Sequence, residues 1–494
     1  MKGEPVAQDF NPNTLYYGDC LDWMREWEAD CVDLIYLDPP FNSNANYNVL
    51  FGAKGDGKAQ YRAFNDTWHW DAAAAERYAE FENAPGRPAH DAMVGLRRIL
   101  GRCGMLAYLT YMAERLEEMR RLLKPTGSIY LHCNQFASHY LKIVMDAVFG
   151  KQNFINEVVW NYGTPSGGRA SGKKPVKVHD YLLAYASSYG KHLYNRQYTP
   201  YSEKYVRDWF RHKDEDGRMY QTRSRKGTIV RQYLDESPGV PLSTVWSDIM
   251  QLSSRRGWFP NTNREETGYP TQKPLALLER IIEASSHEGD LVLDPFCGCG
   301  TAVEAAGRLN RRWAGVDISS FAIDLVRKRL KDESIPVKGI PADLSSARKL
   351  AREKPFEFES WAVTRLPGFA PNTKQVADGG VDGRGMLFDQ PDDWDSRLAL
   401  AQVKGGRFSA SALRDFIGVV ERGKAAIGRF ITLEPVASAD ANSRAAELGS
   451  IAVLGQSYRR LRLWSIDDYF NNRPCPLPPM TNPYTGKLMQ QGLF

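Results

Sequence analysis

The sequence predicts an α/β protein with two domains of unequal size. Short apolar segments alternate with segments whose apolar residues recur at helical spacing, which is typical of a parallel sheet covered by helices on both faces. A glycine-rich segment directly follows one of the apolar segments, as at the ligand-binding edge of such sheets. Near residue 345 the composition changes, and a second α/β pattern runs to about Phe470.

Each element of the first domain follows from an apolar run and from the residues that interrupt it. The predicted strands are Leu15–Tyr17, Val32–Leu37, Ser128–His132, Asp290–Asp294 and Trp313–Val316. Helices are predicted around residues 21–27, over 105–123, from Ala302 and after Asp317. Lys124-Pro125-Thr126-Gly127 ends the second of these helices, because proline cannot continue it.

The composition excludes several classes of protein. The chain is 43% hydrophobic and 25% charged, as in ordinary globular domains. Its seven cysteines include no Cys-x-x-Cys, which favours a reducing compartment over a disulfide framework. No apolar run approaches about 18 residues, and the first ten residues lack the apolar core of a signal peptide. We therefore expect a cytoplasmic protein with no membrane partner.

The glycine-rich loop follows the predicted strand Asp290–Asp294. Phe296-Cys297-Gly298-Cys299-Gly300 has the form F-x-G-x-G, and its glycines let the backbone approach a ligand closely. Asp317 comes 23 residues after Asp294, at the end of the next predicted strand, where a carboxylate can accept both hydroxyls of a ribose. The pair predicts a nucleoside-containing cofactor. The spacing leaves a dinucleotide and S-adenosylmethionine open, and the order of the glycines favours the second.

A second site is predicted where the strand Val32–Leu37 ends at Asp38-Pro39-Pro40-Phe41. The two prolines fix the backbone and remove two N–H donors. The carboxylate of Asp38 and the carbonyl of Pro39 are then two acceptors that could hold the hydrogens of an exocyclic amine. Phe41 could stack on a base that has been flipped out of a duplex. An ordinary turn that ends a strand is the alternative.

The two motifs together resemble the DNA amino-methyltransferases, which act on N6 of adenine or N4 of cytosine. Asp-Pro-Pro-Phe precedes Phe-x-Gly-x-Gly, as in the circularly permuted beta group of that family, and the resemblance covers about residues 12–335. Further stretches similar to that group are Tyr17-Gly18-Asp19-Cys20, His132-Cys133-Asn134, His179-Asp180 and Tyr269-Pro270-Thr271-Gln272-Lys273-Pro274. The resemblance implies a Rossmann-like, S-adenosylmethionine-dependent methyltransferase fold.

The resemblance also implies roles for particular residues. Asp38, Pro39, Pro40 and Phe41 would be catalytic, with the aspartate at the first position favouring adenine over cytosine. Asp19 would reach the adenine of the cofactor, and Thr271–Lys273 its methionine end. The implied cofactor-binding set is Asp19, Thr271, Lys273, Asp294, Phe296, Gly298, Gly300 and Asp317.

Residues 166–231 are the most basic part of the chain. They hold 15 Lys or Arg against 6 Asp or Glu, with eight tyrosines and Trp209 among them. This mixture suits phosphate contacts and base stacking, and a solvated basic surface is the alternative. By resemblance, a target-recognition insert at about residues 160–268 would bind double-stranded DNA. The predicted DNA contacts are Arg169, Lys173, Lys174, Arg223, Arg225 and Lys226.

The second domain carries a different group of polar residues. Asp382 precedes the predicted strand Leu398–Val403, which leads into Gln402-x-Lys404. A carboxylate beside a polar-x-Lys pair can bind Mg²⁺, with Asp382 as the ligand, and position water against a phosphodiester. Residues 354–470 resemble the restriction-endonuclease-like fold of the Mrr type, on the stretches Glu357–Ala362 and Gly428–Leu433. That resemblance implies a nuclease site made of Glu359, Asp382, Gln402 and Lys404.

The predicted organisation is a methyltransferase domain at 1–345, an endonuclease-like domain at 346–470 and a Pro- and Asn-rich tail at 471–494 that is flexible or ordered only on contact. The predicted activity is site-specific methylation of adenine N6 in DNA. Alternatives are N4-cytosine methylation, a Mg²⁺-dependent nuclease whose methyltransferase half serves recognition, and a DNA-binding protein with neither activity. A homodimer or a restriction–modification partner is a further expectation.

Overall fold

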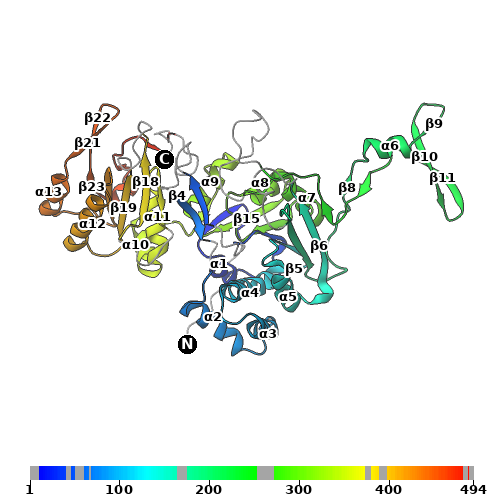
Figure 1. Ribbon diagram of the computed structural model, residues 1–494, viewed down its shortest axis with the longest axis horizontal. Helices are drawn as coiled ribbons and strands as arrows, with labels where there is room; N and C mark the ends of the chain where they lie inside the picture. The colour runs from blue at the N-terminus through cyan, green and yellow to red at the C-terminus, as the bar shows by residue number, and fades with distance from the viewer. Residues whose placement is uncertain are drawn as a thin grey trace.

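A nine-stranded sheet forms the centre of the computed structural model (Figure 1). Its strands, in spatial order, are β13 (Val245–Trp246), β6 (Phe154–Asn161), β7 (His179–Ala186), β5 (Leu123–Cys133), β2 (Val32–Leu37), β14 (Leu291–Asp294), β15 (Arg312–Asp317), β1 (Thr14–Tyr17) and β16 (Val337–Lys338). Only β7 runs antiparallel to its neighbours. The structure describes residues 11–40, 46–50, 60–65, 68–163, 175–252, 272–372, 380–388, 398–481 and 488.

The order of these strands confirms the permuted arrangement expected from the sequence. β14 and β15 come from residues near 300, yet they lie between β2 and β1 from the first 40 residues. β2 pairs with β14 in the register Val292↔Leu34 and Leu293↔Ile35. The carboxyl ends of these two parallel strands therefore meet at one edge of the sheet.

Helices cover both faces of this sheet, so its central strands are buried on both sides and consist of continuous apolar runs. One layer contains α1 (Cys20–Glu26), α2 (Ala72–Glu82), α3 (His90–Leu100), α4 (Gly104–Leu122) and α5 (Ser138–Phe149). The other contains α7 (Leu275–Ser285), α8 (Thr301–Arg308) and α9 (Ser320–Leu330). Along β2, Ile35 and Leu37 face the first layer, whereas Leu34 and Tyr36 face the second. Asp38 follows Tyr36 by two residues, which places it toward the second layer.

An arm extends from the domain between β7 and β13 (Figure 1). Its elements are β8 (Tyr198–Thr199), α6 (Glu203–Trp209), β9 (His212–Lys213), β10 (Met219–Arg225), β11 (Thr228–Tyr233) and β12 (Val240–Pro241). β10 and β11 form an antiparallel hairpin closed by Lys226 and Gly227, which both have positive φ. The predicted insert at 160–268 thus also contains β7 and β13, which belong to the main sheet.

The C-terminal part forms a second sheet. Its path is β17 (Phe369–Pro371), β18 (Gly383–Leu387), β19 (Leu398–Lys404), β20 (Ile427–Thr432) and β23 (Leu461–Ser465). β24 (Met480–Thr481) pairs with β18, so the tail is ordered against this sheet as far as Thr481. The surrounding helices are α10 (Leu344–Glu353), α11 (Pro355–Thr364), α12 (Ala410–Arg422), α13 (Ala439–Glu447) and α14 (Ile466–Phe470). The remaining pairs are β21 (Ser450–Val453) with β22 (Gln456–Arg459), and β3 (Asn46–Leu50) with β4 (Gln60–Asn65).

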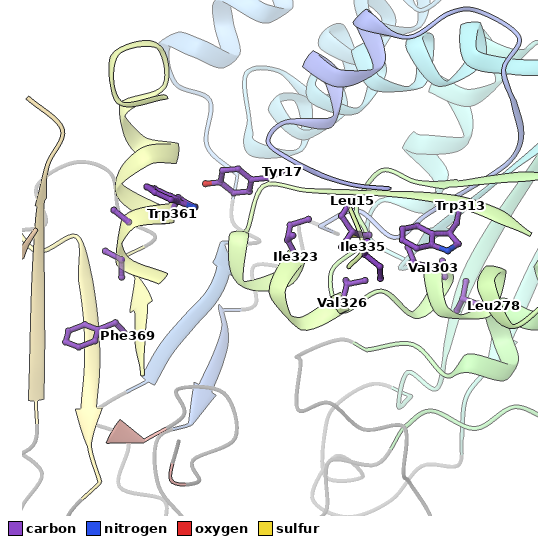
Figure 2. Close-up of a cluster of buried hydrophobic side chains, with 14 of the residues drawn as sticks. Leu15, Tyr17, Leu278, Val303, Trp313, Ile323, Val326, Ile335, Trp361 and Phe369 are labelled. Carbon is purple, nitrogen blue, oxygen red and sulfur yellow. The ribbon is translucent and has the colours of Figure 1, made fainter. Parts of the chain in front are cut away.

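One apolar core joins the two sheets. It contains Leu15, Ile323 and Val326 from the first domain together with Trp361 and Phe369 from the second. Figure 2 shows these side chains in a continuous row from α8 and α9 to α11. Within the described ranges, no helix has the length and apolar character needed to cross a membrane.

Candidate functional site

The candidate site lies at the edge where β2 and β14 end. Asp38 and Asp294 occupy corresponding places at the ends of these neighbouring strands. Pro39 is buried and Pro40 is half-buried directly after Asp38, so the turn that leaves β2 is held by packing as well as by the two rings. The structure therefore brings together the two motifs that the sequence separates by more than 250 residues.

The glycine loop after β14 folds tightly against β15 and α9. Gly298 and Gly300 have φ of 47° and 75°. A Cβ on Gly300 would lie 2.7 Å from Cγ2 of Val326, so only glycine fits both the conformation and the space. Gly298 N donates to Oδ2 of Asp317 over 2.8 Å, which joins the loop to the end of β15. Phe296 N donates to Asp294 over 3.1 Å at the start of the same loop.

Two carboxylates at this edge have perturbed acidity. Burial raises the pKa of Asp294 well above its usual range, and the charges of Asp38 and Asp317 add to the rise. Burial also raises the pKa of Asp317 to about 6, although the N–H groups of Ser319 and Gly298 oppose it. Three acidic groups thus share a poorly solvated edge, which suits a ligand that carries positive charge.

The pH dependence of ligand binding should report the pKa of Asp317. The ionised carboxylate is the form that accepts two hydroxyl hydrogens, so affinity for a ribose should fall about tenfold per pH unit below pH 6. Titration calorimetry with S-adenosylhomocysteine between pH 5 and 8 would measure the change, since 5 and 8 bracket a pKa of about 6. In Asp317→Asn the affinity should be low at every pH. A pH dependence that persists in this variant would assign it to another group.

Lys273 pairs with Asp38, which differs from the role implied by the sequence. Its Nζ lies 2.5 Å from Oδ2 of Asp38, and both side chains are largely buried. The resemblance implied that Lys273 contacts the methionine end of a cofactor, whereas here it contacts the predicted catalytic carboxylate. Lys273 comes just before α7, the helix that lies on the Tyr36 face of β2. The sequence held no signal for this pair, because 235 residues separate its members.

Asp19 is held by the protein itself. Its Oδ1 accepts from Leu21 N over 2.9 Å and caps α1. Its carboxylate also receives both Nη2 bonds from the buried Arg115, at 2.7 and 2.5 Å. The carboxylate therefore fixes the turn between β1 and α1, and this capping accounts for the residue without a ligand.

A buried polar network lies under the catalytic edge. The hydroxyl of Tyr36 and Nδ1 of His132 share a hydrogen bond of 3.1 Å. Nε2 of His132 lies 3.6 Å from Asp180, which Lys177 contacts at 2.5 Å. Burial acts to raise the pKa of Asp180, but His132 and Lys177 together hold it well below its usual range. His132 and Asp180 stand in stretches that the sequence singled out, whereas Tyr36 gave no signal beyond an apolar strand.

The structure describes only some of the predicted DNA contacts. Arg223 lies on β10 and donates from Nη2 to the hydroxyl of Tyr205 over 3.2 Å. Lys226 is exposed at the turn of the hairpin, beside Ile229, which is 74% exposed. Arg169, Lys173, Lys174, Phe41, Thr271 and the side chain of Arg225 lie outside the described residues.

The predicted nuclease residues meet at the end of the second sheet. Asp382 lies directly before β18, and its Oδ2 accepts from Val403 N over 2.7 Å. Its carboxylate is thus held between Gln402 and Lys404 on β19. Glu359 is half-buried on α11, the helix that packs on β18 and β19 through Val363 and Phe358. In the described part of the chain, no three His, Cys, Asp or Glu side chains form a group that could hold a metal ion.

Comparison with known proteins identifies the family. Residues 32–328 match the DNA methylase family N6_N4_Mtase. The chain belongs to this DNA methylase family. The match begins with β2 and ends within α9, so it includes both the Asp-Pro-Pro-Phe tip and the glycine loop.

Individual relatives of this DNA methylase agree with the assignment. Type II methyltransferase M2.DpnII of Streptococcus pneumoniae is 31% identical over 330 residues, which are 66% of this chain and 91% of the relative. Type II methyltransferase M.EcaI of Enterobacter cloacae is 28% identical over 268 residues. That alignment includes 45% of this chain but only 57% of M.EcaI, so the chain spans little more than half the length of this relative.

Solved structures also resemble this DNA methylase. The DNA modification methylase TTHA0409 of Thermus thermophilus, complexed with S-adenosyl-L-methionine, matches 67% of this chain and 98% of its own. The two chains are 17% identical and superpose with a TM-score of 0.34.

Proposed function

We propose that this DNA methylase transfers a methyl group from S-adenosylmethionine to the N6 amine of an adenine flipped out of double-stranded DNA. The observation that carries the proposal is the meeting of Asp38 with the glycine loop at one sheet edge. A methyl donor held at the loop would thereby face an amine held at Asp38. The aspartate at the first position of the motif supports adenine, and N4 of cytosine is the competing acceptor.

The residues of the glycine loop fit the proposed cofactor. Asp317 offers a carboxylate for the ribose, and its carboxylate also accepts from Gly298 N and Ser319 N, which fixes its orientation. The exposed side chain of Ile318 follows directly and offers an apolar surface for the adenine ring. When bound, the sulfonium supplies an activated methyl group for direct displacement. The carboxylates of Asp38 and Asp294 would stabilise its positive charge.

The protein's own contribution to the reaction is to position the amine. Lys273 contacts Oδ2 of Asp38, and Oδ1 is the second acceptor of that carboxylate. An amine hydrogen at Oδ1 and the other at the Pro39 carbonyl would turn the nitrogen lone pair out of the base plane. The amine loses one proton as the new bond forms, and Asp38 is placed to accept it.

The hairpin arm supports DNA as the substrate. From Met219 to Tyr233 the sequence of the arm has no acidic residue and four basic ones, which are Arg223, Arg225, Lys226 and Arg231. Arg231 lies over the ring of Tyr220, at 4.8 Å from its centroid. Acidic residues of the arm gather at its base, where Asp235 and Glu236 pair with Arg218. This separation leaves the distal part positive and suited to phosphate groups.

Product analysis tests the proposed reaction. Purified protein would be incubated with mixed-sequence DNA and methyl-labelled S-adenosylmethionine in the presence of a chelator, and the DNA then digested to nucleosides. Labelled N6-methyladenine supports the proposal in full, while labelled N4-methylcytosine changes only the acceptor base. No label in any nucleoside, under conditions where Asp38→Asn is equally inactive, would reject methyl transfer.

A second candidate activity is Mg²⁺-dependent cleavage of DNA by the C-terminal domain. The amide oxygen of Gln402 is buried and accepts no hydrogen bond from any described residue, and it lies at the same strand end as Asp382. A buried acceptor without a donor costs about 1–3 kcal/mol, and a cation shared with Asp382 would satisfy it. Phosphate oxygens and water would complete the coordination of such an ion.

Nicking of supercoiled plasmid would measure this activity. We expect cleavage with Mg²⁺ that is lost in Lys404→Met and retained in Lys349→Met, an exposed lysine on α10. Cleavage that is retained in Asp38→Asn would separate it from methyl transfer. Plasmid that stays intact with Mg²⁺ would leave the C-terminal domain as a DNA-binding module.

A further inference from the structure

Helix α11 of the C-terminal domain lies against the turn that follows β1. The hydroxyl of Tyr17, the last residue of β1, donates to the carbonyl of Glu357 over 2.8 Å. Lys354 donates to Asp22 on α1 over 2.7 Å. Both bonds therefore reach the strand end that carries the Gly18–Asp19 turn.

Further polar contacts continue this interface along α9. Arg365 donates from Nη2 to Asp324 over 2.9 Å, and the hydroxyls of Thr364 and Ser320 lie 2.9 Å apart. Burial acts to lower the pKa of Arg365, but the charge of Asp324 raises it above its usual value. The interface thus combines paired polar groups with the apolar core shown in Figure 2. Such an arrangement resists sliding of one domain on the other.

The same turn borders the nucleoside site. Tyr17 is in register with Asp317 on β15, and Gly18 N donates to the Asp317 carbonyl over 3.0 Å. A Cβ built on Gly18 would lie 3.8 Å from a carboxylate oxygen of Glu357. Asp317, the Gly18 turn and α11 are therefore successive neighbours. A displacement of α11 would be transmitted through the Tyr17 hydroxyl to the backbone that holds Asp317.

We propose that α11 positions the nucleoside half of the cofactor site, so that docking of the C-terminal domain and cofactor binding strengthen each other. This inference rests on the proposed function, because it takes the ligand at Asp317 to be adenosine-containing. Tyr17 and Lys354 act as positioning residues that touch no ligand. Coupling of this kind is reciprocal, so the ligand must stabilise α11 by the same factor by which α11 strengthens ligand binding.

Calorimetry with S-adenosylhomocysteine tests one direction of the coupling. Tyr17→Phe removes the bond to the Glu357 carbonyl and keeps the ring, while Lys354→Met removes the exposed ion pair with Asp22. Each variant should bind the probe at least about fivefold more weakly than wild type. Arg348→Met is the matched control, because it removes an exposed ion pair with Glu434 within the C-terminal domain and should leave the affinity unchanged.

Hydrogen exchange tests the other direction. Amides of α11 in the full-length protein should exchange more slowly when S-adenosylhomocysteine is present, and this protection should shrink in Lys354→Met. Lys354→Met alters an exposed pair, so it tests the inference even where Tyr17→Phe fails to fold. Unchanged affinity in the variants, or unchanged protection of α11, would overturn the coupling. Failure of the wild type to bind the probe would instead refute the proposed cofactor, which keeps the two conclusions distinct.

Discussion

Replacing Asp38 by asparagine is expected to lower the rate of methyl transfer by about 1,000-fold, the cost of losing one preorganised charge at a reacting centre. Asparagine keeps the size of the side chain but presents an NH₂ group where an acceptor is needed. It also removes the negative partner of Lys273, whose ammonium would then face the incoming amine. Single-turnover transfer of labelled methyl to DNA would measure the rate.

A variant far from the site controls for this substitution. Asp440 on α13 is exposed and pairs with Arg444, so Asp440→Asn removes an ion-paired carboxylate without touching the methyltransferase domain. Its rate should equal that of wild type. Retention of more than about a tenth of the activity in Asp38→Asn would show that another group holds the amine.

Replacing Trp361 by alanine should destabilise the whole chain by about 3–5 kcal/mol. The indole is completely buried on α11 and packs against Phe358, Tyr469 and Phe470. Because the core that contains it continues into the first domain, we expect one cooperative unfolding transition that shifts as a unit (Figure 2). Urea unfolding followed by circular dichroism and by tryptophan fluorescence would measure the free energy of unfolding.

Phe356 on the same helix supplies the control. Its ring is 51% exposed, so Phe356→Ala should change the free energy of unfolding by less than about 0.5 kcal/mol. Two separate transitions, of which Trp361→Ala shifts only one, would contradict a shared core. The two domains would then be independent folding units.

The central sheet was predictable from the sequence because its strands are continuous apolar runs with clear ends. The predicted strand Val32–Leu37 has these bounds in the structure, and the strand predicted at Asp290–Asp294 differs from β14 by one residue. The neighbouring positions of Asp38 and the glycine loop also followed, since both motifs end parallel strands and the family resemblance fixed the order of those strands.

Other features depend on contacts that sequence patterns do not encode. The pair Lys273–Asp38 and the bond from Tyr17 to Glu357 each join residues more than 200 positions apart. The arm was treated as a basic region with poor periodicity, because its strands are exposed on both faces and show no apolar alternation. Lys226-Gly227 between two β-prone runs was a usable hairpin signal that the charge pattern obscured.

The placement of β14 and β15 between β2 and β1 also sets the order of events during synthesis. Ile35 and Leu293 pair directly, so the N-terminal strands must wait for about 258 further residues before the sheet can close. At translation rates of about 5–20 residues per second this wait lasts on the order of 10–50 s. During that time the edges of β1 and β2 toward β14 and β15 lack their partners, and unpaired strand edges are prone to aggregation. The nascent chain therefore exposes apolar strand edges for most of its synthesis, and we expect its yield of folded protein to depend on chaperones that bind such edges.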